Sequence, residues 1–404
     1  WGSLWLAQKQ PDQAVQVIQA GLSANLDDVS SVLRGQYDLG LFTYEKFASL
    51  ALTYPHILDQ VSVVVIDEVQ MLADESRGAN LEFLMTVIAT RSSEGARLQL
   101  IALSGVVGDT NGLERWLTAR LLRRDERPVP LDEGIITGDG RRRFIDGVTG
   151  EETTTPGYVQ RVATGKGLSQ EIVIPLVRKL VDAGQQVIVF REQVGETRGC
   201  AEYLASALGL PPAKDAIERL PRGDQSMASS ALRGVLGRGV AFHNSHLSPD
   251  ERRVIEEEFR AIDSDIKVIV ATTTLAMGVN TPASSVVVVG LEHPGDTPYS
   301  IAEYKNLVGR AGRLGFSEHG ASYLVAMTGN DEHHYWQRYV LGAPEGLRSR
   351  FLDERSDPRS LAIRMLAASK RVAPRGLCGN DIAAFLERSF GGFQERERHG
   401  DAWC

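Results

Sequence analysis

The sequence predicts an α/β fold built on parallel sheets and divided between two or three domains. Short runs rich in β-branched residues, such as residues 61–66, 187–190 and 286–289, are apolar except for Ser62, which is typical of strands buried on both faces of a parallel sheet. Segments of helical character separate these runs. The chain has 404 residues, 43% of them hydrophobic, which is enough for two or three domains with ordinary cores.

The first part of the chain alternates strands and helices. We expect a strand over residues 15–21, a helix over 27–33, a strand over 39–42, a helix over 44–52 and strands over 61–66 and 98–103. Residues 132–161 are rich in Gly, Thr and charge, and predict an excursion or hairpin between domains. In its middle stand Arg141, Arg142 and Arg143, which fit either contact with nucleic acid or a solvated loop.

The second part repeats the alternation. An amphipathic helix begins at Leu168, and the further elements are strands over 187–190, 240–242, 268–271, 286–289 and 321–326, with a helix over 251–260. Residues 290–300 contain two prolines and predict a short turn or hairpin. Between Arg338 and Arg375 nine Lys and Arg stand against four acids, an excess that fits either phosphate binding or packing against acidic domains.

Composition narrows the environment of the protein. The three cysteines, Cys200, Cys378 and Cys404, have no metal-binding spacing, and such scattered thiols predict a reducing cytoplasm. Association of the protein with a nucleoid or nucleus is compatible with this location. No apolar run approaches the roughly 20 residues that a membrane helix needs, and the first residues lack the layout of a signal peptide. The net charge of −8 is compatible with nucleic-acid binding confined to a channel.

Two acids directly follow the first continuously apolar run. Asp67 and Glu68 come after residues 61–66, so they should lie at the carboxyl edge of a parallel sheet, where open α/β sheets bind ligands. An Asp at this edge can hold Mg²⁺, often through water, and an adjacent Glu can activate an attacking water. A polar turn that merely closes a buried strand is the alternative interpretation.

A pair of arginines lies far downstream. Arg310 and Arg313 are three residues apart and predict a shared helical face, with Gly309 and Gly312 each preceding one of them. Arginine stays charged at neutral pH and binds phosphate oxygens as a bidentate fork, and small neighbours allow close approach of the backbone. A solvated basic helix start is the alternative.

The acid pair and the arginine pair together resemble motifs II and VI of superfamily 2 helicases, especially the superkiller-like branch of DEAH-related enzymes. Three further stretches occur in the order of that branch: residues 43–47 look like motif Ib, residues 102–105 stand where motif III belongs, and residues 271–283 are close to motif V. The resemblance covers most of the chain and is most specific over residues 268–315. It is closest to DNA-repair helicases that have a winged helix after the motor domains.

This resemblance implies a particular domain organisation. We expect two RecA-like parallel-sheet motor domains in tandem, followed by a partial, helical winged-helix domain. The corresponding ranges are a partial first RecA-like domain over 1–130, a hairpin or linker over 131–167, a second RecA-like domain over 168–335 and a partial winged-helix domain over 336–404.

The resemblance also implies roles for residues at matching positions. ATP and Mg²⁺ would bind between the motor domains, with Asp67 positioning the metal, Glu68 activating water and Arg310 and Arg313 acting on the γ-phosphate. The implied nucleotide contacts are Gln70, Ser104, Gly278, Asn280 and Asn306, and the implied nucleic-acid contacts are Thr43, Arg191, Thr272 and Thr273. Thr43 also fits a helix cap, and His243 and His246 fit loop histidines better than metal ligands.

Some positions depart from the family pattern. Val106 removes the hydroxyl that ends motif III, and Asn306 replaces the usual Gln of motif VI. No stretch matches the phosphate-loop pattern G-x-x-x-x-G-K-[ST], and the only Gly-Lys pair, Gly165 and Lys166, is followed by Gly167. We therefore expect a chain truncated at its amino end, and also at its carboxyl end. A natural helicase relative that has lost nucleotide binding is the alternative.

The function predicted in this way is an ATP-dependent helicase or translocase that moves 3′ to 5′ on single-stranded or partly duplex nucleic acid. DNA is favoured over RNA because a winged helix directly follows the motors. The alternatives are an RNA helicase of the same branch and a binding module that grips nucleic acid without hydrolysis. The oligomeric state is not predicted, and a monomer is compatible with the sequence.

Overall fold

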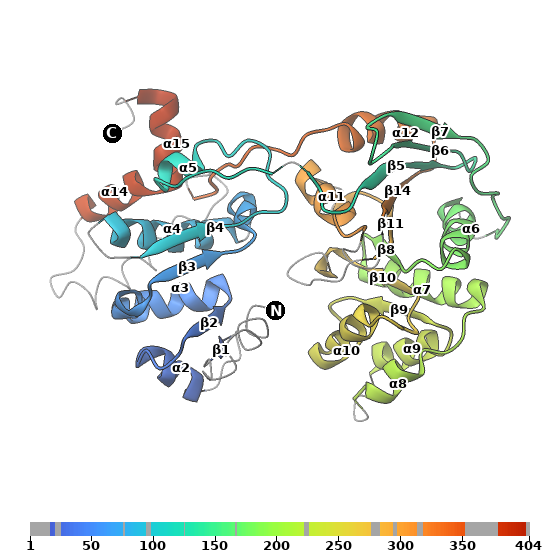
Figure 1. The fold of residues 1–404 in the computed structure, drawn as a ribbon, viewed down its shortest axis with the longest axis horizontal. Coiled ribbons are helices and arrows are strands. Elements are labelled where there is room, and N and C mark those ends of the chain that lie inside the picture. Colours follow the sequence, from blue (N-terminus) through green and yellow to red (C-terminus); the bar gives the residue numbers. More distant parts are fainter. Residues whose placement is uncertain are drawn as a thin grey trace. The chain divides into compact units, whose positions relative to one another are not determined.

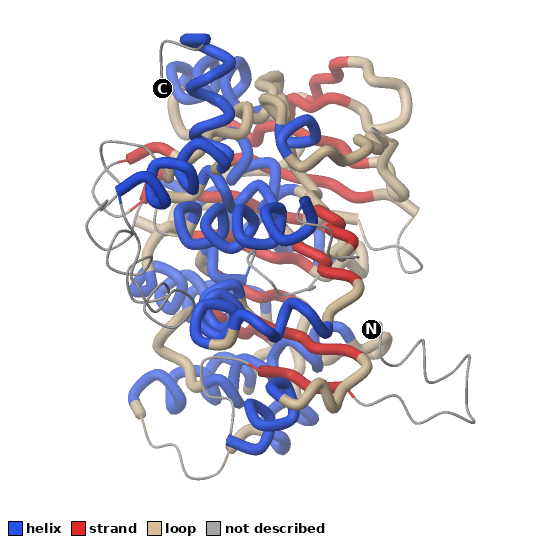
Figure 2. Tube along the Cα trace, turned by 90° about the vertical axis from the view of Figure 1, so that its left-hand side faces the viewer, coloured by secondary structure: helices blue, strands red, loops and turns tan. Residues whose placement is uncertain are grey.

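The structure is a computed structural model that describes residues 17–20, 26–75, 77–93, 98–124, 126–165, 168–221, 226–275, 283–293, 297–312, 318–351 and 379–400. The chain divides into two compact units. Unit 1 comprises Trp1–Leu122 and Gly346–Cys404, and unit 2 comprises Arg123–Glu345. Figure 1 labels the elements along the chain, and Figure 2 shows strands running alongside one another with helices packed against them.

Unit 1 contains two pairs of parallel strands. The strand β1 (Val17–Ala20) pairs with β2 (Leu39–Phe42), and β3 (Val63–Ile66) pairs with β4 (Gln99–Ala102). The helical segments of unit 1 are α2 (Leu26–Leu33), α3 (Tyr44–Thr53), η1 (Pro55–Gln60), η2 (Val69–Ala73), α4 (Gly78–Ser93), α5 (Leu113–Trp116), α14 (Gly379–Arg388) and α15 (Phe390–His399). The strands and helices predicted over residues 15–103 are therefore confirmed within a few residues.

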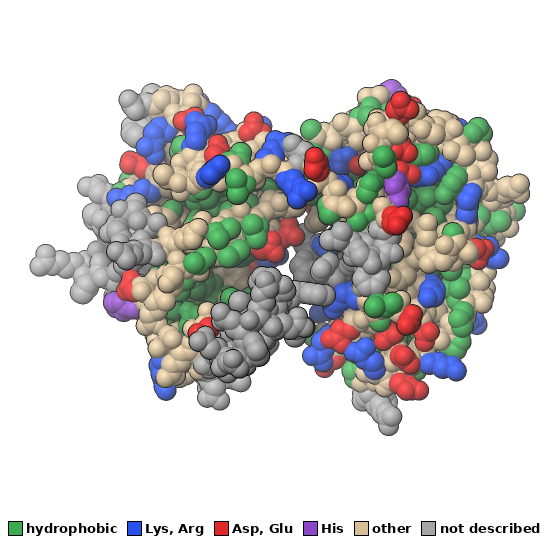
Figure 3. Space-filling model, viewed as in Figure 1, with side chains coloured by type: hydrophobic (Ala, Val, Ile, Leu, Met, Phe, Trp, Pro, Cys, Tyr) green, Lys and Arg blue, Asp and Glu red, His purple; other side chains and the backbone are tan. Residues whose placement is uncertain are grey.

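The strand β3 is buried on one face only, so the prediction of burial on both faces is wrong. Val64 and Ile66 belong to the core of unit 1, whereas Val63 and Val65 are 48% and 53% exposed. Hydrophobic side chains gather over β3 and β4 on the face shown in Figure 3. The continuous apolar run could not reveal this, because successive residues of a strand point to opposite faces and both faces carry valine or isoleucine here.

Unit 2 is built on an eight-stranded sheet in the order β7-β6-β5-β14-β11-β8-β10-β9. Its strands are β5 (Leu131–Thr137), β6 (Arg142–Ile145), β7 (Glu152–Thr155), β8 (Val187–Arg191), β9 (Val240–His243), β10 (Val268–Ala271), β11 (Ser285–Val289) and β14 (Gly320–Ala326). The strands from β5 to β9 in this order are parallel, and β6 and β7 extend the sheet in antiparallel fashion. The mostly parallel sheet agrees with the predicted fold class.

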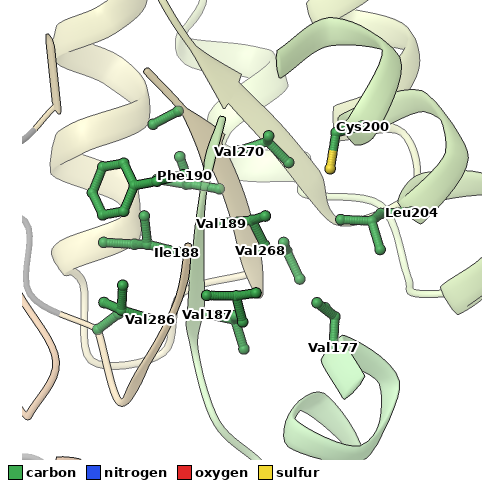
Figure 4. Close-up of a cluster of buried hydrophobic side chains, with 14 of the residues drawn as sticks. Val177, Val187, Ile188, Val189, Phe190, Cys200, Leu204, Val268, Val270 and Val286 are labelled. Atoms are coloured by element: carbon green, nitrogen blue, oxygen red, sulfur yellow. The ribbon is translucent and has the colours of Figure 1, made fainter. Parts of the chain in front are cut away.

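Helices enclose the sheet of unit 2. They are α6 (Leu168–Asp182), α7 (Val194–Leu208), α8 (Lys214–Arg219), α9 (Met227–Leu236), α10 (Pro249–Arg260), η3 (Thr273–Leu275), α11 (Ile301–Val308), α12 (Gly329–Tyr335) and η4 (Trp336–Val340). The central strands β8 and β10 are almost wholly buried, as predicted, with Val177 and Leu204 of the covering helices packed nearby (Figure 4). Cys200 lies in this core, and burial raises the pKa of its thiol to about 11.

Residues 131–155 are strands of this sheet rather than a separate connection between domains. The strand β5 pairs with β14 along its whole length, from Leu131 opposite Gly320 to Thr137 opposite Ala326. The boundary between the two compact units therefore lies between Leu122 and Arg123. It precedes the range 131–167, which was expected to be a hairpin or linker.

The arginine triplet in this region has a structural role that neither alternative anticipated. Arg141 donates to both carboxylate oxygens of Glu332, at 3.0 and 2.8 Å. Arg142 is buried, 3.0 Å from the carboxylate of Asp132, and Arg143 lies over the ring of Trp336 at 3.9 Å. These contacts fasten the β5–β6 hairpin to α12 and η4.

The carboxyl-terminal region is shared between the units. The segments α12 and η4 pack on the sheet of unit 2, where Trp336 is buried beside Ile135. From Gly346 onward the chain groups with unit 1, and Leu347 N–H donates to Asp109 O at 2.8 Å. The contact boundary thus falls ten residues later than the start of the predicted range 336–404, and much of the arginine-rich stretch lies outside the described residues.

Candidate functional site

The predicted acid pair lies at the carboxyl edge of the β3–β4 pair in unit 1. The parallel register places Ile66 opposite Ala102, so Asp67 and Leu103 leave the two strands side by side. Two backbone hydrogen bonds continue beyond the strands, from Leu103 N–H to Ile66 O at 2.8 Å and from Val69 N–H to Leu103 O at 2.9 Å. The edge position predicted from the sequence is confirmed.

Glu68 has a left-handed backbone conformation, with φ of 54°. This region is uncommon for residues other than glycine and stores strain that the surrounding structure must balance. Here the Glu68 N–H donates to Asp67 Oδ1 at 2.9 Å, and η2 begins at the next residue. A strained residue at a ligand-binding edge is typical of a functional site.

A chain of side-chain hydrogen bonds connects the two predicted motifs at this edge. Gln70 donates through Nε2 to Glu68 Oε2, and Ser104 donates through Oγ to Gln70 Oε1. The structure therefore brings Glu68, Gln70 and Ser104 together across the ends of β3 and β4. A change in the position of one of these side chains would be transmitted to the other two.

Tyr44 supports the acid pair from α3, a role that its residue type and position in the sequence do not signal. Its hydroxyl donates to the carbonyl oxygen of Asp67. Burial, followed by the charge of Asp67, raises the pKa of Tyr44 to about 12, so this hydroxyl keeps its proton at neutral pH. The preceding residue, Thr43, caps α3 by accepting from Lys46 N–H at 3.3 Å, which confirms the capping interpretation of Thr43.

The arginine pair belongs to unit 2, and its predicted helical face is wrong. The helix α11 ends at Val308, so Arg310 stands in the turn that follows the helix. Gly312 in the same turn has φ of +86°, a conformation that favours glycine and stops a helix. Arg313 lies outside the described residues.

Backbone hydrogen bonds join this turn to the end of predicted motif V. Ala283 N–H donates to Arg310 O at 3.0 Å, and Gly312 N–H donates to Ala283 O at 2.9 Å. Asn306 lies on α11 and is half-buried. The predicted nucleotide contacts Gly278 and Asn280 lie outside the described residues.

Three of the predicted nucleic-acid contacts lie at one edge of the unit 2 sheet. The pairing of β10 with β8 sets Ala271 opposite Phe190, so Thr272 and Arg191 follow at the same level. Thr272 is buried, and Thr273 begins η3. Arg191 forms an ion pair with Glu196 at 3.4 Å, and a phosphate contact by Arg191 would have to compete with this carboxylate.

Residues 290–300 contain a short antiparallel hairpin, as the sequence predicted. It pairs β12 (Glu292–His293) with β13 (Thr297–Pro298). His293 lies 3.0 Å from the carboxylate of Glu303 on α11, and its ring lies 4.5 Å from that of Tyr299. The hairpin is thereby fixed to the helix that precedes Arg310.

Histidines form no metal site in the part of the chain that the structure describes. His243 is buried and pairs with Glu256 at 2.8 Å, which agrees with its predicted structural role. No group of three His, Cys, Asp or Glu residues able to hold a metal is found among the described residues. The same residues include no helix that is both long and apolar enough to span a bilayer.

The mostly parallel α/β fold is of the kind predicted from the sequence, and comparison with known proteins finds similarity to helicases. Residues 219–315 match the family model "Helicase conserved C-terminal domain". These residues include β9, α10, β10, β11, the hairpin, α11 and the turn at Arg310, all described above.

Curated relatives extend the similarity over most of the chain. The chain is 34% identical to the ATP-dependent DNA helicase Hel308 of Pyrobaculum calidifontis, over 84% of this chain and 46% of the relative. Hel308 of Thermoplasma volcanium is 33% identical over 80% of this chain and 44% of the relative, and Hel308 of Thermoplasma acidophilum is 34% identical over 77% and 42%. The chain is therefore similar to proteins named ATP-dependent DNA helicase Hel308, and it spans about half the length of the curated relatives it matches.

Proposed function

We propose that the protein containing this chain is an ATP-dependent DNA helicase that moves 3′ to 5′ along single-stranded or partly duplex DNA. One observation carries the proposal: the linked side chains of Glu68, Gln70 and Ser104 at a strained carboxyl edge. These are the residues that motifs II and III of the family would provide. The names of the relatives support ATP as the energy source and DNA as the substrate.

The acid pair would provide the hydrolytic chemistry. Asp67 and Glu68 present carboxylate oxygens, the donors that Mg²⁺ prefers, and Asp67 is exposed at the edge, so these residues fit the ion. When bound, Mg²⁺ would neutralise charge on the phosphates of ATP. Glu68 would orient and deprotonate the attacking water, while Gln70 holds the Glu68 carboxylate in place.

The turn after α11 would contribute positive charge. Arg310 and Arg313 would stabilise the charge that develops on the γ-phosphate, and Asn306, Gly278 and Asn280 would contact the nucleotide. These residues all fall within the range of unit 2.

Contacts to the DNA backbone would come from strand ends in both units. The hydroxyls of Thr43, Thr272 and Thr273 can donate to phosphate oxygens. The guanidinium of Arg191 can do so through its N–H groups. The short hairpin between β11 and α11 would separate the duplex ahead of the tracked strand. We place this activity in the cytoplasm, where it would act on chromosomal DNA.

The decisive experiment measures ATP hydrolysis and ATP binding by the protein expressed from its complete reading frame. Glu68→Gln should abolish DNA-stimulated hydrolysis and leave ATP binding unchanged, because the amide keeps the size of the side chain but is not a base. The matched control is Glu126→Gln, which alters a side chain that is 86% exposed. Turnover in Glu68→Gln equal to that of the unaltered protein would refute the role of Glu68.

The same assay separates the alternatives. Stimulation by RNA but not by DNA would favour an RNA helicase. A protein that binds DNA without any hydrolysis would be a nucleic-acid-binding relative of the helicases rather than an enzyme.

A further inference from the structure

The turn that carries Arg310 is held by an arginine from the chain that connects the two units. Arg127 follows shortly after the boundary between Leu122 and Arg123. Its Nη2 donates to Gly309 O at 3.2 Å and to Ala311 O at 3.3 Å. These carbonyls belong to the residues before and after Arg310, so one guanidinium nitrogen contacts the backbone of both neighbours of Arg310.

The residues after Arg127 pack against the same turn. A side chain at Gly312 would place its Cβ 2.9 Å from Val129 Cγ1, so only glycine fits between Val129 and the turn. Pro130 O accepts a hydrogen bond from Gly320 N–H at 2.9 Å, which joins this stretch to the start of β14. Residues 127–130 therefore form the surface on which the turn rests.

The helix before the turn has polar contacts of its own, distinct from the hydrogen bonds of Arg127. Lys305 on α11 donates to Glu133 Oε1 at 2.7 Å and to Val340 O at 2.9 Å. Glu345 accepts from the first amides of α11, Ile301 N–H at 2.7 Å and Ala302 N–H at 3.0 Å. Loss of Arg127 would leave these hydrogen bonds in place, so it should act on the turn first, although the charge of Arg127 also acts on Glu133.

We propose that Arg127 is a positioning residue for Arg310, which ties the connection between the units to the turn that acts on the γ-phosphate. This inference rests on the proposed ATPase function. Charge-assisted hydrogen bonds to the two flanking carbonyls restrict the directions that the Arg310 side chain can take. Arg127 would affect mainly the rate of hydrolysis, because the transition state demands more accurate placement of charge than ATP binding does.

The test compares Arg127→Ala with Arg124→Ala in the protein expressed from its complete reading frame. Arg124 lies in the same connection, but its side chain is 81% exposed and its partner Glu126 is 3.7 Å away, so it is the matched control. Arg127→Ala should lower kcat for DNA-stimulated hydrolysis by about tenfold or more, since misplacement of a catalytic group by about 1 Å can reduce rate by about a hundredfold. KM for ATP should stay within about twofold, and Arg124→Ala should behave like the unaltered protein.

Two further measurements distinguish positioning from a general effect on folding. Arg127→Ala should weaken binding of ADP with aluminium fluoride, a transition-state analogue, without weakening binding of ADP. Arg127→Lys, which keeps the charge and hydrogen-bond donors, should restore part of kcat. If Arg127→Ala unfolds below the assay temperature, Arg127→Gln replaces it under the same criteria.

A double variant connects the effect to Arg310. If Arg127 acts through Arg310, adding Arg127→Ala to Arg310→Ala should cause no further loss of analogue binding. An equal loss in both backgrounds, or the same kcat for Arg127→Ala and Arg124→Ala, would overturn the inference and leave the proposed function standing. Unchanged hydrolysis in Arg310→Ala would instead refute the proposed role of that arginine.

Discussion

A buried carboxyl group attaches the carboxyl-terminal segment of unit 1 to the rest of that unit and should make this attachment depend on pH. Glu82 lies on α4 and is fully buried. Its Oε1 accepts from Gly391 N–H at 2.7 Å, and its Oε2 accepts from Ser349 Oγ–H at 2.6 Å. Burial raises the pKa of Glu82 from 4.5 to about 7 despite these hydrogen bonds.

The direction of the effect follows from the two pKa values. The folded protein keeps the Glu82 proton to a higher pH than the unfolded chain does. The contribution of Glu82 to the free energy of unfolding is therefore fully present below pH 4.5 and is lost as pH rises to about 7. At about 1.4 kcal/mol per pH unit, the loss is about 3 kcal/mol. Above pH 7 the contribution should change no further.

Glu82→Gln should remove this dependence. The glutamine stays neutral, its amide oxygen can accept from Gly391 N–H, and its amide nitrogen can donate to Ser349 Oγ. The variant should match the unaltered protein near pH 4 and exceed its stability by up to about 3 kcal/mol above pH 7.

The assay is hydrogen exchange of the α15 amides between pH 4 and 8, corrected for the intrinsic exchange rates. It reports the free energy of opening of the segment that Glu82 holds. Glu126→Gln, an exposed substitution, is the control and should leave the profile unchanged. Opening free energies that run parallel with pH in Glu82→Gln and the unaltered protein would refute the reasoning.

Two other substitutions test the remaining contacts. Ser104→Ala removes the hydroxyl that donates to Gln70, and should lower kcat for ATP hydrolysis about three- to tenfold without changing ATP affinity. Steady-state kinetics and a binding titration would measure the two quantities. An equal loss of ATP affinity would contradict coupling through Gln70. Arg142→Met leaves the carboxylate of Asp132 buried without its guanidinium, and should destabilise unit 2 by about 3 kcal/mol in thermal unfolding; a change below about 1 kcal/mol would show that the pair is dispensable.

The sequence predicts strands of the unit 2 sheet well because their burial is uniform. The run over residues 187–190 became β8 (Val187–Arg191), and the run over 268–271 became β10 (Val268–Ala271). The run over residues 61–66 has the same composition, yet one face of β3 is exposed. Apolar composition permits burial of both faces but does not supply the layer that would cover the second one.

Turn chemistry and long-range contacts were harder to predict. Gly309 and Gly312 were visible as small residues that permit close approach, but Gly312 also ends the helical geometry, so Arg310 lies in a turn. The contact of Arg127 with Gly309 joins residues 182 positions apart, and no periodicity in the sequence signals it. The arginine triplet was misleading for a related reason, because its partners Glu332 and Trp336 lie in a distant helical segment.

The topology explains why residues at strand ends are easier to predict from sequence than the residues that hold them in position. Parallel strands place the residues that follow them at one edge, so Asp67, Glu68 and Thr272 could be located from strand ends alone. Residues that hold such sites in position, Tyr44 at the edge of unit 1 and Arg127 at the turn of unit 2, do so through backbone carbonyls of other segments. Carbonyl groups occur at every residue, so a side chain that binds them leaves no signature of residue type at the position it contacts. Edge residues should therefore be found by motif, whereas the residues that position them require the structure.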